Sequence, residues 1–294
     1  MSLELKKSYF AFFMITLFWG ITFPLIRMSV QVLTPAQFVF LRFGSAFLLM
    51  IPFVIKRGLT SKEVGEPLLF VKAFDLGVLT WICYQAQTIG LQTVESGRAA
   101  FITGTSVVMI PMMSPLFGLG MPKRMDFMAA LGALAGLYLL TDPIAQQMSG
   151  GDFWMILCAF IYATYLHCLQ RWVRHGADAL LMTFFQILGV TFCSCLLNWH
   201  AGDVFPTLNR EIVIAIGICA LFSTVLATLL QTNFQSRLTP EKAALIFSLE
   251  SVFASIFGYW ILGEVLTVRG LVGCVVIFGA IVGSELFKAR EKKL

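Results

Sequence analysis

The sequence contains little charge for its length. Only 13% of its 294 residues are Asp, Glu, Lys or Arg, whereas 58% are hydrophobic, and the mean hydropathy is +0.85. A soluble domain is typically about half apolar and about a quarter charged. The apolar excess cannot be buried in one core, so much of it must face lipid. The composition therefore excludes a soluble enzyme, a fibrous protein and a disordered chain.

Sequence motifs of enzymes and ATP-driven pumps are also missing. The three histidines, His167, His175 and His200, are too widely spaced for a zinc-binding H-E-x-x-H motif. The sequence has no Gly-x-Ser-x-Gly turn and no P-loop, and its aspartates do not cluster as a magnesium–pyrophosphate site requires. We therefore expect no enzyme, no catalytic residue, no metal and no cofactor. The seven cysteines lie inside apolar runs, which favours packing over a disulfide framework.

Ten apolar runs cover most of the chain, and each approaches the roughly 20 residues that a transmembrane helix needs. Short segments with turn-forming residues, such as Thr34-Pro35 and Asp142-Pro143, separate them. The sequence therefore predicts an all-α integral membrane protein with ten transmembrane helices. The runs are 9–26, 36–55, 73–91, 99–119, 127–140, 153–169, 179–197, 212–230, 243–262 and 271–286.

Basic residues lie mainly on one side of this topology. If the N-terminus is inside, 16 of the 21 Lys and Arg residues fall in cytoplasmic segments and four in outer loops, with Arg42 inside a helix. Cytoplasmic loops carry such an excess. We therefore expect a multi-pass protein of the inner (cytoplasmic) membrane with both termini in the cytoplasm. The net charge of +5 then reflects contact with a lipid bilayer, and we expect no nucleic-acid partner.

The two halves of the chain resemble each other at an offset of 143 residues. Each half has five apolar runs, an odd number, so equivalent helices must point in opposite directions, as in transporters built from inverted repeats. We place the first repeat at residues 1–143 and the second at 152–288. The offset aligns Leu119-Gly120 with Leu262-Gly263, Ala100 with Ala243, and Gly136 with Gly279.

Four motifs, in order, resemble the EamA-type domains of the drug/metabolite transporter superfamily. The first is W-G-I-T-F-P at 19–24, and the second is L-R-F at 41–43. The third is F-I-T-G at 101–104, which Val107, Val108 and Pro111 follow. The fourth is S-L-E-S-V-F-A at 248–254 followed by L-G-E at 262–264, with Ser251 where the family usually has proline.

This resemblance covers nearly the whole chain as two tandem domains. It implies a ten-helix inner-membrane carrier that works by alternating access, with the fifth and tenth helices at the periphery. Family members handle amino acids, amines, sugar derivatives, nucleotide-like solutes and drugs, so the resemblance leaves the substrate open. In the first half, Met121 replaces the glutamate that would match Glu264.

Two polar residues are expected near the outer side of the bilayer. At 1.5 Å per residue, Arg42 and Gln85 lie roughly 9 Å below the outer face. An arginine at that depth is expensive, and a functional role is the default interpretation. Arg42 is therefore a candidate for binding an anion or carboxylate; the alternative is a structural tether whose long side chain reaches the interface.

Two further polar residues, Glu250 and Gln186, lie about 10 Å above the cytoplasmic face by the same count. A carboxyl at that depth is costly to ionise, which makes Glu250 a candidate proton-coupling site. It could instead bind an amine or make a structural hydrogen bond. Because Arg42 and Glu250 differ by about 10 Å in depth, no direct salt bridge is expected between them.

Aromatic residues complete the expected site. Trp19 and Tyr162 both fall near the midplane and nearly coincide under the repeat offset, so their rings could line a cavity between the repeats. Tyr84 is a secondary candidate. The expected substrate-binding residues are Trp19, Arg42, Tyr84, Gln85, Tyr162, Gln186 and Glu250, with Glu250 also expected to couple transport to protons.

Small residues suggest how the helices pack. The pairs Gly132/Gly136 and Gly279/Gly283 allow close helix approach. We expect this packing within a monomer, with a homodimer contact as the alternative. Glu264 is expected to pair or cap at the outer surface, near Arg269, rather than to touch substrate.

The expected function is a secondary transporter of a small metabolite, with protons as candidate coupling ions. An amino acid-like or related polar or aromatic solute moved by export is the first interpretation. Uptake or exchange of a nucleotide-like or other metabolite is the alternative, and a channel or scaffold protein is a weaker one because no ring of identical polar residues lies at one level.

The topology makes a direct prediction. Single cysteines placed at Lys62 and at Lys292 should react with a membrane-impermeant thiol reagent only from the cytoplasmic side, because both positions lie in segments assigned to that side. Labelling of intact cells and of inverted vesicles measures this. Periplasmic labelling at either position would overturn the topology.

Overall fold

The helices of the protein follow the ten expected runs. The computed structural model describes residues 3–58, 67–141, 148–173, 178–201, 208–265 and 267–291, and within these ranges it contains helices but no strands. Lys62, Asp142-Pro143, His175 and Lys292 lie outside the described residues. Eight helical segments of the described chain are long and apolar enough to cross a membrane, and a shorter apolar stretch covers Val268–Gly283. The predicted all-α membrane fold is confirmed.

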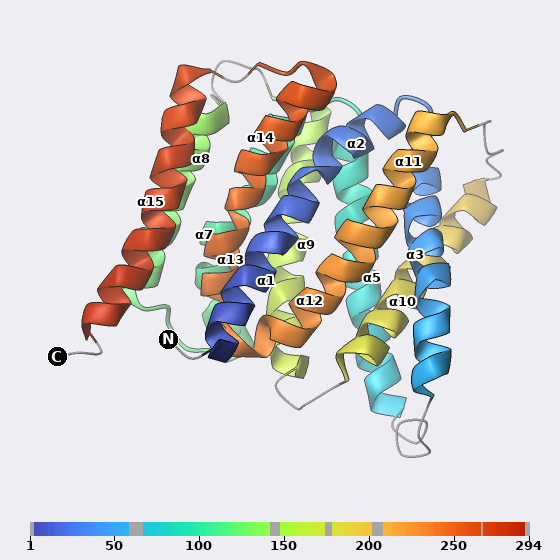
Figure 1. Ribbon diagram of the computed structural model, residues 1–294, viewed down its shortest axis with the longest axis horizontal. Helices are drawn as coiled ribbons and strands as arrows, with labels where there is room; N and C mark the ends of the chain where they lie inside the picture. The colour runs from blue at the N-terminus through green and yellow to red at the C-terminus, as the bar shows by residue number, and fades with distance from the viewer. Residues whose placement is uncertain are drawn as a thin grey trace.

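Several of the ten segments consist of more than one helix (Figure 1). The first half contains α1 (Leu3–Gly20) with α2 (Thr22–Ser29), α3 (Pro35–Arg57), α5 (Pro67–Gly90), α6 (Ser96–Gly104) with α7 (Ser106–Met113) and the 3₁₀ turn η1 (Ser114–Phe117), and α8 (Arg124–Thr141). The second half contains α9 (Gly150–Val173), α10 (Ala179–Ala201), α11 (Arg210–Ile218) with the π-helix η2 (Cys219–Leu226), α12 (Ala227–Phe234) and the 3₁₀ turn η3 (Gln235–Arg237), α13 (Pro240–Phe247) with α14 (Leu249–Leu262), and α15 (Val268–Glu291).

Two of the Thr-Pro pairs that separate apolar runs are helix N-caps. The Thr34 hydroxyl accepts a hydrogen bond from the backbone N–H of Gln37, whose side chain accepts one from the Thr34 N–H. Thr239 likewise accepts from the N–H of Lys242. The proline that follows each threonine is suited to the first helical position, where no N–H partner is needed. The same residues therefore end one loop and start the next membrane helix.

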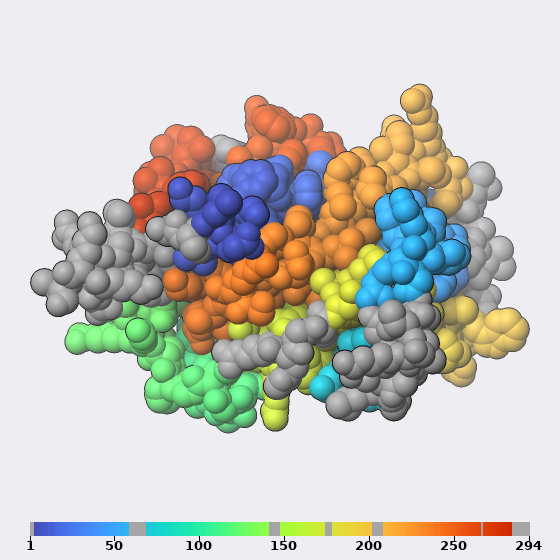
Figure 2. Space-filling model, turned by 60° about the horizontal axis from the view of Figure 1, so that its bottom comes forward, coloured from blue at the N-terminus to red at the C-terminus, as the bar shows by residue number. Residues whose placement is uncertain are grey.

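Successive segments alternate in direction. In Figure 1, α1 and α2 run from the bottom to the top, whereas α9, which begins the second half, runs from the top to the bottom. The start of α1 and the end of α15 lie at the same end of the bundle, which we call the termini face; the other end is the opposite face. Figure 2 turns the termini face forward and shows the beginning of α1 beside α12. This arrangement is that of two inverted halves.

Helices α8 and α15 form a pair at one edge of the bundle (Figure 1). A Cβ added to Gly136 would lie 2.8 Å from the carbonyl oxygen of Gly273, and one added to Gly132 would lie 3.3 Å from the Cβ of Ala280. The first glycine pair therefore packs within the monomer, as expected. Gly279 and Gly283 instead face open space.

The contrast between the two glycine pairs gives a prediction with a built-in control. Gly136→Ala should lower the free energy of unfolding by about 1–3 kcal/mol, because the added methyl group overlaps α15. Gly279→Ala makes the same chemical change in open space and should leave stability unchanged or slightly raised, since alanine favours helix. Thermal unfolding of both variants in the same detergent measures the difference. Equal effects would contradict this packing of α8 against α15.

Candidate functional site

A cavity lies between the two halves at the middle of the bundle. The centre of a water molecule has about 70 Å³ to move in, and one water needs roughly 10–15 Å³ on that measure. The space therefore suits a small solute. The lining residues come from seven of the ten segments and are Trp19, Thr22, Thr80, Cys83, Tyr84, Gln87, Ala100, Thr103, Gly104, Ser106, Cys158, Tyr162, Tyr165, Gln186, Thr228, Gln231, Ala244, Phe247, Ser248, Glu250 and Ser251.

Three of the segments that border this cavity are interrupted beside it. The interruptions lie at Ile21, Thr105 and Ser248, and the last two are 143 residues apart, which is the repeat offset. At each interruption a hydroxyl group donates to the backbone carbonyl three residues earlier, at 2.6 Å in every case, and such bonds bend helices. The donor–acceptor pairs are Thr22–Trp19, Thr105–Ile102 and Ser248–Leu245.

A fourth segment is distorted into the π-helix η2, and Arg42 of α3 holds it. The guanidinium donates from Nε to the Thr224 hydroxyl at 2.8 Å and from Nη2 to the Ser223 hydroxyl at 2.9 Å. Both hydroxyl groups donate in turn to the Cys219 carbonyl. A π-helix leaves the regular helical pattern and is common at functional sites. Arg42, only 1% exposed, thus occupies the position of a tether.

The Arg42 side chain does not line the cavity. Its guanidinium carbon lies 4.4 Å from the ring centroid of Tyr84, and Tyr84 is a lining residue. Gln85, on the same helix as Tyr84, is not a lining residue either. The roles expected for Arg42 and Gln85 in substrate binding stay predictions, and the geometry places both outside this cavity.

Aromatic rings form one wall of the cavity. The rings of Trp19 and Tyr162 meet edge to face, with centroids 5.7 Å apart and an interplanar angle of 87°. Phe247 lies 5.0 Å from Trp19, and Tyr165 stacks on Tyr162 at 5.9 Å. The two midplane aromatics expected from the sequence therefore come together, although they lie on helices from opposite halves.

Polar groups also contribute to the lining. The Gln186 amide nitrogen donates to the Thr80 hydroxyl at 3.0 Å and to the Tyr165 hydroxyl at 3.1 Å. The Gln231 amide nitrogen donates to the Tyr162 hydroxyl at 3.1 Å. These bonds connect α9 to α10 and to α12, and they fix the tyrosine rings that border the cavity.

Glu250 is the acidic residue of the lining, and it lies in the first turn of α14. The start of a helix carries positive potential, which favours a carboxylate there. No side chain or backbone group of the described ranges donates a hydrogen bond to this carboxylate. Interrupted membrane helices often direct their ends at a ligand, and Glu250 is placed in this way.

The sequence thus identified five residues that line the cavity: Trp19, Tyr84, Tyr162, Gln186 and Glu250. It did not put the hydroxyl residues at the helix interruptions in the site. The sequence did contain an indication of these residues, because Thr22 and Ser248 belong to the motifs that carried the family resemblance. The other lining residues that were missed include Thr80, Thr103, Ser251 and Phe247.

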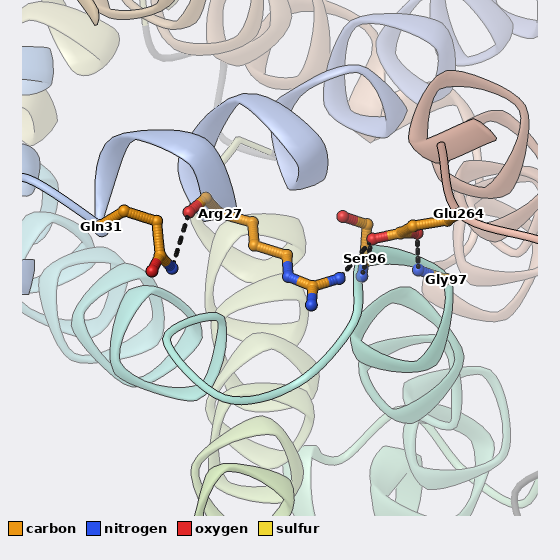
Figure 3. Close-up of polar contacts among 5 residues, drawn as sticks. All are labelled: Arg27, Gln31, Ser96, Gly97 and Glu264. Atoms are coloured by element: carbon orange, nitrogen blue, oxygen red, sulfur yellow. Dashed lines mark hydrogen bonds and ion pairs between the residues drawn. The ribbon is translucent and has the colours of Figure 1, made fainter. Parts of the chain in front are cut away.

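The opposite face is held together by Glu264, which follows α14. Figure 3 shows its carboxylate between Arg27, at the end of α2, and the first residues of α6. Arg27 Nη1 donates to it at 2.6 Å, and the backbone N–H groups of Ser96 and Gly97 donate at 2.9 and 3.3 Å. The Arg27 carbonyl accepts from Gln31 on the same turn. Glu264 therefore pairs and caps as expected, but its basic partner is Arg27; Arg269 lies over the Tyr138 ring instead.

A second ion pair joins α6 to α9 near the same face. Arg98 donates from Nε and Nη2 to the two carboxylate oxygens of Asp152, both at 2.9 Å, and the side chains are 9% and 2% exposed. The two-pronged geometry strengthens such a pair. This ion pair and the Glu264 contacts together connect the N-terminal end of α6 to α2, α9 and α14.

The contacts between segments at the termini face are more exposed. Arg57 pairs with Asp178, and Arg237 pairs with Glu4, with side chains between 26% and 54% exposed. Exposed ion pairs contribute only about 0–1 kcal/mol each. The Ser114 hydroxyl also donates to Glu241 across this end. The opposite face is therefore the more firmly closed end of the described structure.

Comparison with known proteins agrees with this architecture. A solved crystal structure superposes with a TM-score of 0.76 over 97% of this chain and 98% of its own, at 16% sequence identity. That likeness shows the fold. An uncharacterized transporter of Archaeoglobus fulgidus is 29% identical over 269 residues, which cover 92% of this chain and 82% of the relative.

Two bacterial relatives carry more descriptive names. The threonine/homoserine exporter RhtA of Salmonella typhimurium is 28% identical over 80% of this chain and 76% of its own length. The uncharacterized inner membrane transporter YedA of Escherichia coli is 23% identical over 98% of this chain and 94% of its own. The model of the EamA-like transporter family matches residues 6–142 and again residues 149–285. The protein therefore belongs to the EamA-like transporter family, as a multi-pass membrane transporter of small metabolites within the drug/metabolite transporter superfamily.

Proposed function

We propose that the protein exports an amino acid-like metabolite across the inner membrane by alternating access. The central cavity is the substrate site, and Glu250 couples movement of the substrate to protons. The observation that carries this proposal is a carboxylate without a hydrogen-bond donor from the described chain, placed in a small cavity between two inverted halves. Burial of an ionisable group inside the membrane costs free energy, so a functional role is the default interpretation of such a group.

The helix interruptions support movement about this cavity. Alternating access requires parts of the bundle to rock around a fixed site, and interrupted helices provide positions at which the two parts of a segment can change angle. Here the interruptions at Thr105 and Ser248 flank the cavity in related positions of the two halves. A channel would not need such paired interruptions.

The size of the cavity supports a small substrate. A space on the order of five waters is comparable to a small amino acid, whereas a nucleotide is several times larger. The relative RhtA is named as an exporter of threonine and homoserine, and this name supports both the substrate class and the direction that we propose. The smaller size argues against the nucleotide-like alternative.

Orientation completes the proposal. The excess of basic residues assigns the termini face to the cytoplasm, so the Glu264 contacts lie at the outer face. The described structure then corresponds to a state closed toward the outside. Opening for release would have to separate Glu264 from Arg27 and from the start of α6.

The aromatic wall leads to a first functional prediction. Trp19→Ala and Tyr162→Ala should each lower the rate of metabolite counterflow in proteoliposomes about tenfold or more, because each removes a ring that faces the cavity, and binding loses about 1.4 kcal/mol or more. Phe53→Ala is the control, since Phe53 is 62% exposed on the outside of α3.

Phe47 of the same helix is not a suitable lipid-facing control. Phe47 stacks on Phe184 at 5.1 Å and packs against a buried cluster. Equal losses in the Trp19, Tyr162 and Phe53 variants would mean that the cavity is not the substrate site.

A second functional prediction concerns Glu250. Glu250→Gln keeps the shape of the side chain but cannot exchange a proton at any relevant pH. The variant should fold and insert, lose the response of transport to a pH gradient, and retain exchange at equal pH when substrate is saturating. Proteoliposome uptake with and without a pH gradient measures this.

The matched control is Glu211→Gln, which removes an exposed carboxylate outside the cavity. This control should keep the wild-type pH response. A well-folded Glu250→Gln protein with wild-type binding and wild-type pH dependence would sink the proposed role of Glu250. A loss of expression and melting temperature without a selective transport defect would identify Glu250 as structural.

A further inference from the structure

We infer that the cavity selects its substrate by an ammonium group and that a carboxylate on the substrate is dispensable. This inference rests on the proposed transport function and names the substrate class of the same site. It comes from the charge and the hydrogen-bond polarity of the lining: the groups around the cavity offer acceptors and one negative charge, while several of their donors are engaged elsewhere.

The hydroxyl groups of the lining show this polarity most directly. A hydroxyl has one hydrogen to donate and two lone pairs that accept. Four lining hydroxyls donate their hydrogen to backbone carbonyls, at distances from 2.6 to 3.2 Å. They can therefore only accept a hydrogen bond from a ligand. The four donors are Thr22 to Trp19, Thr103 to Ala99 and Ala100, Ser248 to Leu245, and Ser251 to Ala100.

Other donors of the lining are engaged in the same way. The indole N–H of Trp19 donates to the Ser223 carbonyl at 3.1 Å. The Gln186 amide nitrogen donates to two hydroxyls, and the amide oxygens of Gln186 and Gln87 are buried without a partner in the described ranges. A ligand that brings its own donors would match these acceptors.

Charge points to the same conclusion. The lining residues include Glu250 but no Lys, Arg or His. The nearby cation, Arg42, is not a lining residue: it donates to Ser223 and Thr224, and its guanidinium carbon lies 4.4 Å from the centroid of the Tyr84 ring. A bound carboxylate would therefore meet the negative charge of Glu250 without a positive partner in the lining. A bound ammonium would meet an opposite charge.

The aromatic wall adds a third feature suited to a cation. Ammonium groups are attracted to the faces of Trp and Tyr rings, most strongly where water is excluded. Trp19, Tyr162 and Tyr165 supply such rings next to the polar lining. Because the cavity is small, the matching ligand is a compact primary amine, either alone or as the amino group of a small amino acid.

Three closely related ligands test the inference on the wild-type protein. We would measure binding of 2-aminobutyrate, of propylamine, which lacks the carboxylate, and of butyrate, which lacks the ammonium group, by calorimetry in detergent. Both ammonium-bearing ligands should bind at least about tenfold more tightly than butyrate, the size expected for a partly desolvated charge pair. Butyrate binding as tightly as propylamine, or none of the three binding, would overturn the inference.

Variants then connect the preference to Glu250. In Glu250→Gln the ratio of propylamine to butyrate affinity should fall to within a few fold, whereas Glu211→Gln should keep the wild-type ratio. An unchanged ratio in Glu250→Gln overturns the role of this carboxylate in selection. If that variant does not fold, the wild-type comparison of the three ligands still decides between ammonium and carboxylate selection.

Transport is measured separately from binding, so that the proposed transport function and the selection of ammonium can each be contradicted independently. Counterflow of labelled 2-aminobutyrate tests the proposed transport function, and the binding series tests the selection of ammonium. Counterflow together with equal binding of butyrate and propylamine would leave the transporter in place and remove the inference. Preferential amine binding without counterflow would support the site and contradict the proposed transport.

Discussion

Lipid provides no hydrogen-bond partners for the backbone, so a membrane helix can be interrupted only where protein or a cavity covers the interruption. This constraint explains where the interruptions of this protein lie. The interruptions at Ile21, Thr105 and Ser248 all border the central cavity, and a neighbouring hydroxyl satisfies a carbonyl at each one. In η2 the Ser223 and Thr224 hydroxyls donate to the Cys219 carbonyl, and Arg42 donates to both hydroxyls. Polar residues are therefore concentrated beside the cavity because the interrupted backbone needs them there.

A difference between the two halves explains why the two ends of the bundle differ. Glu264 fastens the opposite face by accepting from Arg27, Ser96 and Gly97. The repeat offset places Met121 at the equivalent position of the first half, and a methionine cannot accept such bonds. Among the described residues, the ion pairs between segments at the termini face are more exposed.

Composition and charge were sufficient to predict the all-α membrane fold, because lipid imposes length and hydropathy on every span. The depth of a residue in the membrane could also be estimated from its position along its helix. This estimate placed Trp19 and Tyr162 at one level, and their rings do meet. The direction in which a side chain points could not be derived from its position along the helix. Arg42 and Gln85 were placed at a plausible depth, but the orientation of Arg42 depends on hydroxyl groups about 180 residues further along the chain. The packing of Phe47 could not be predicted in this way either, since its partner Phe184 is on another helix.

In the proposed transport cycle, one cavity is reached alternately from the two faces, and Glu264 controls access from one of them. A single cysteine at Thr103, a cavity-lining position of α6, tests this in an otherwise cysteine-free protein reconstituted with known orientation. A membrane-impermeant thiol reagent should label it slowly from the opposite face. Glu264→Gln should speed labelling from that face and slow labelling from the termini face by a comparable factor. Unchanged labelling from both faces, or faster labelling from both at once, would contradict the account.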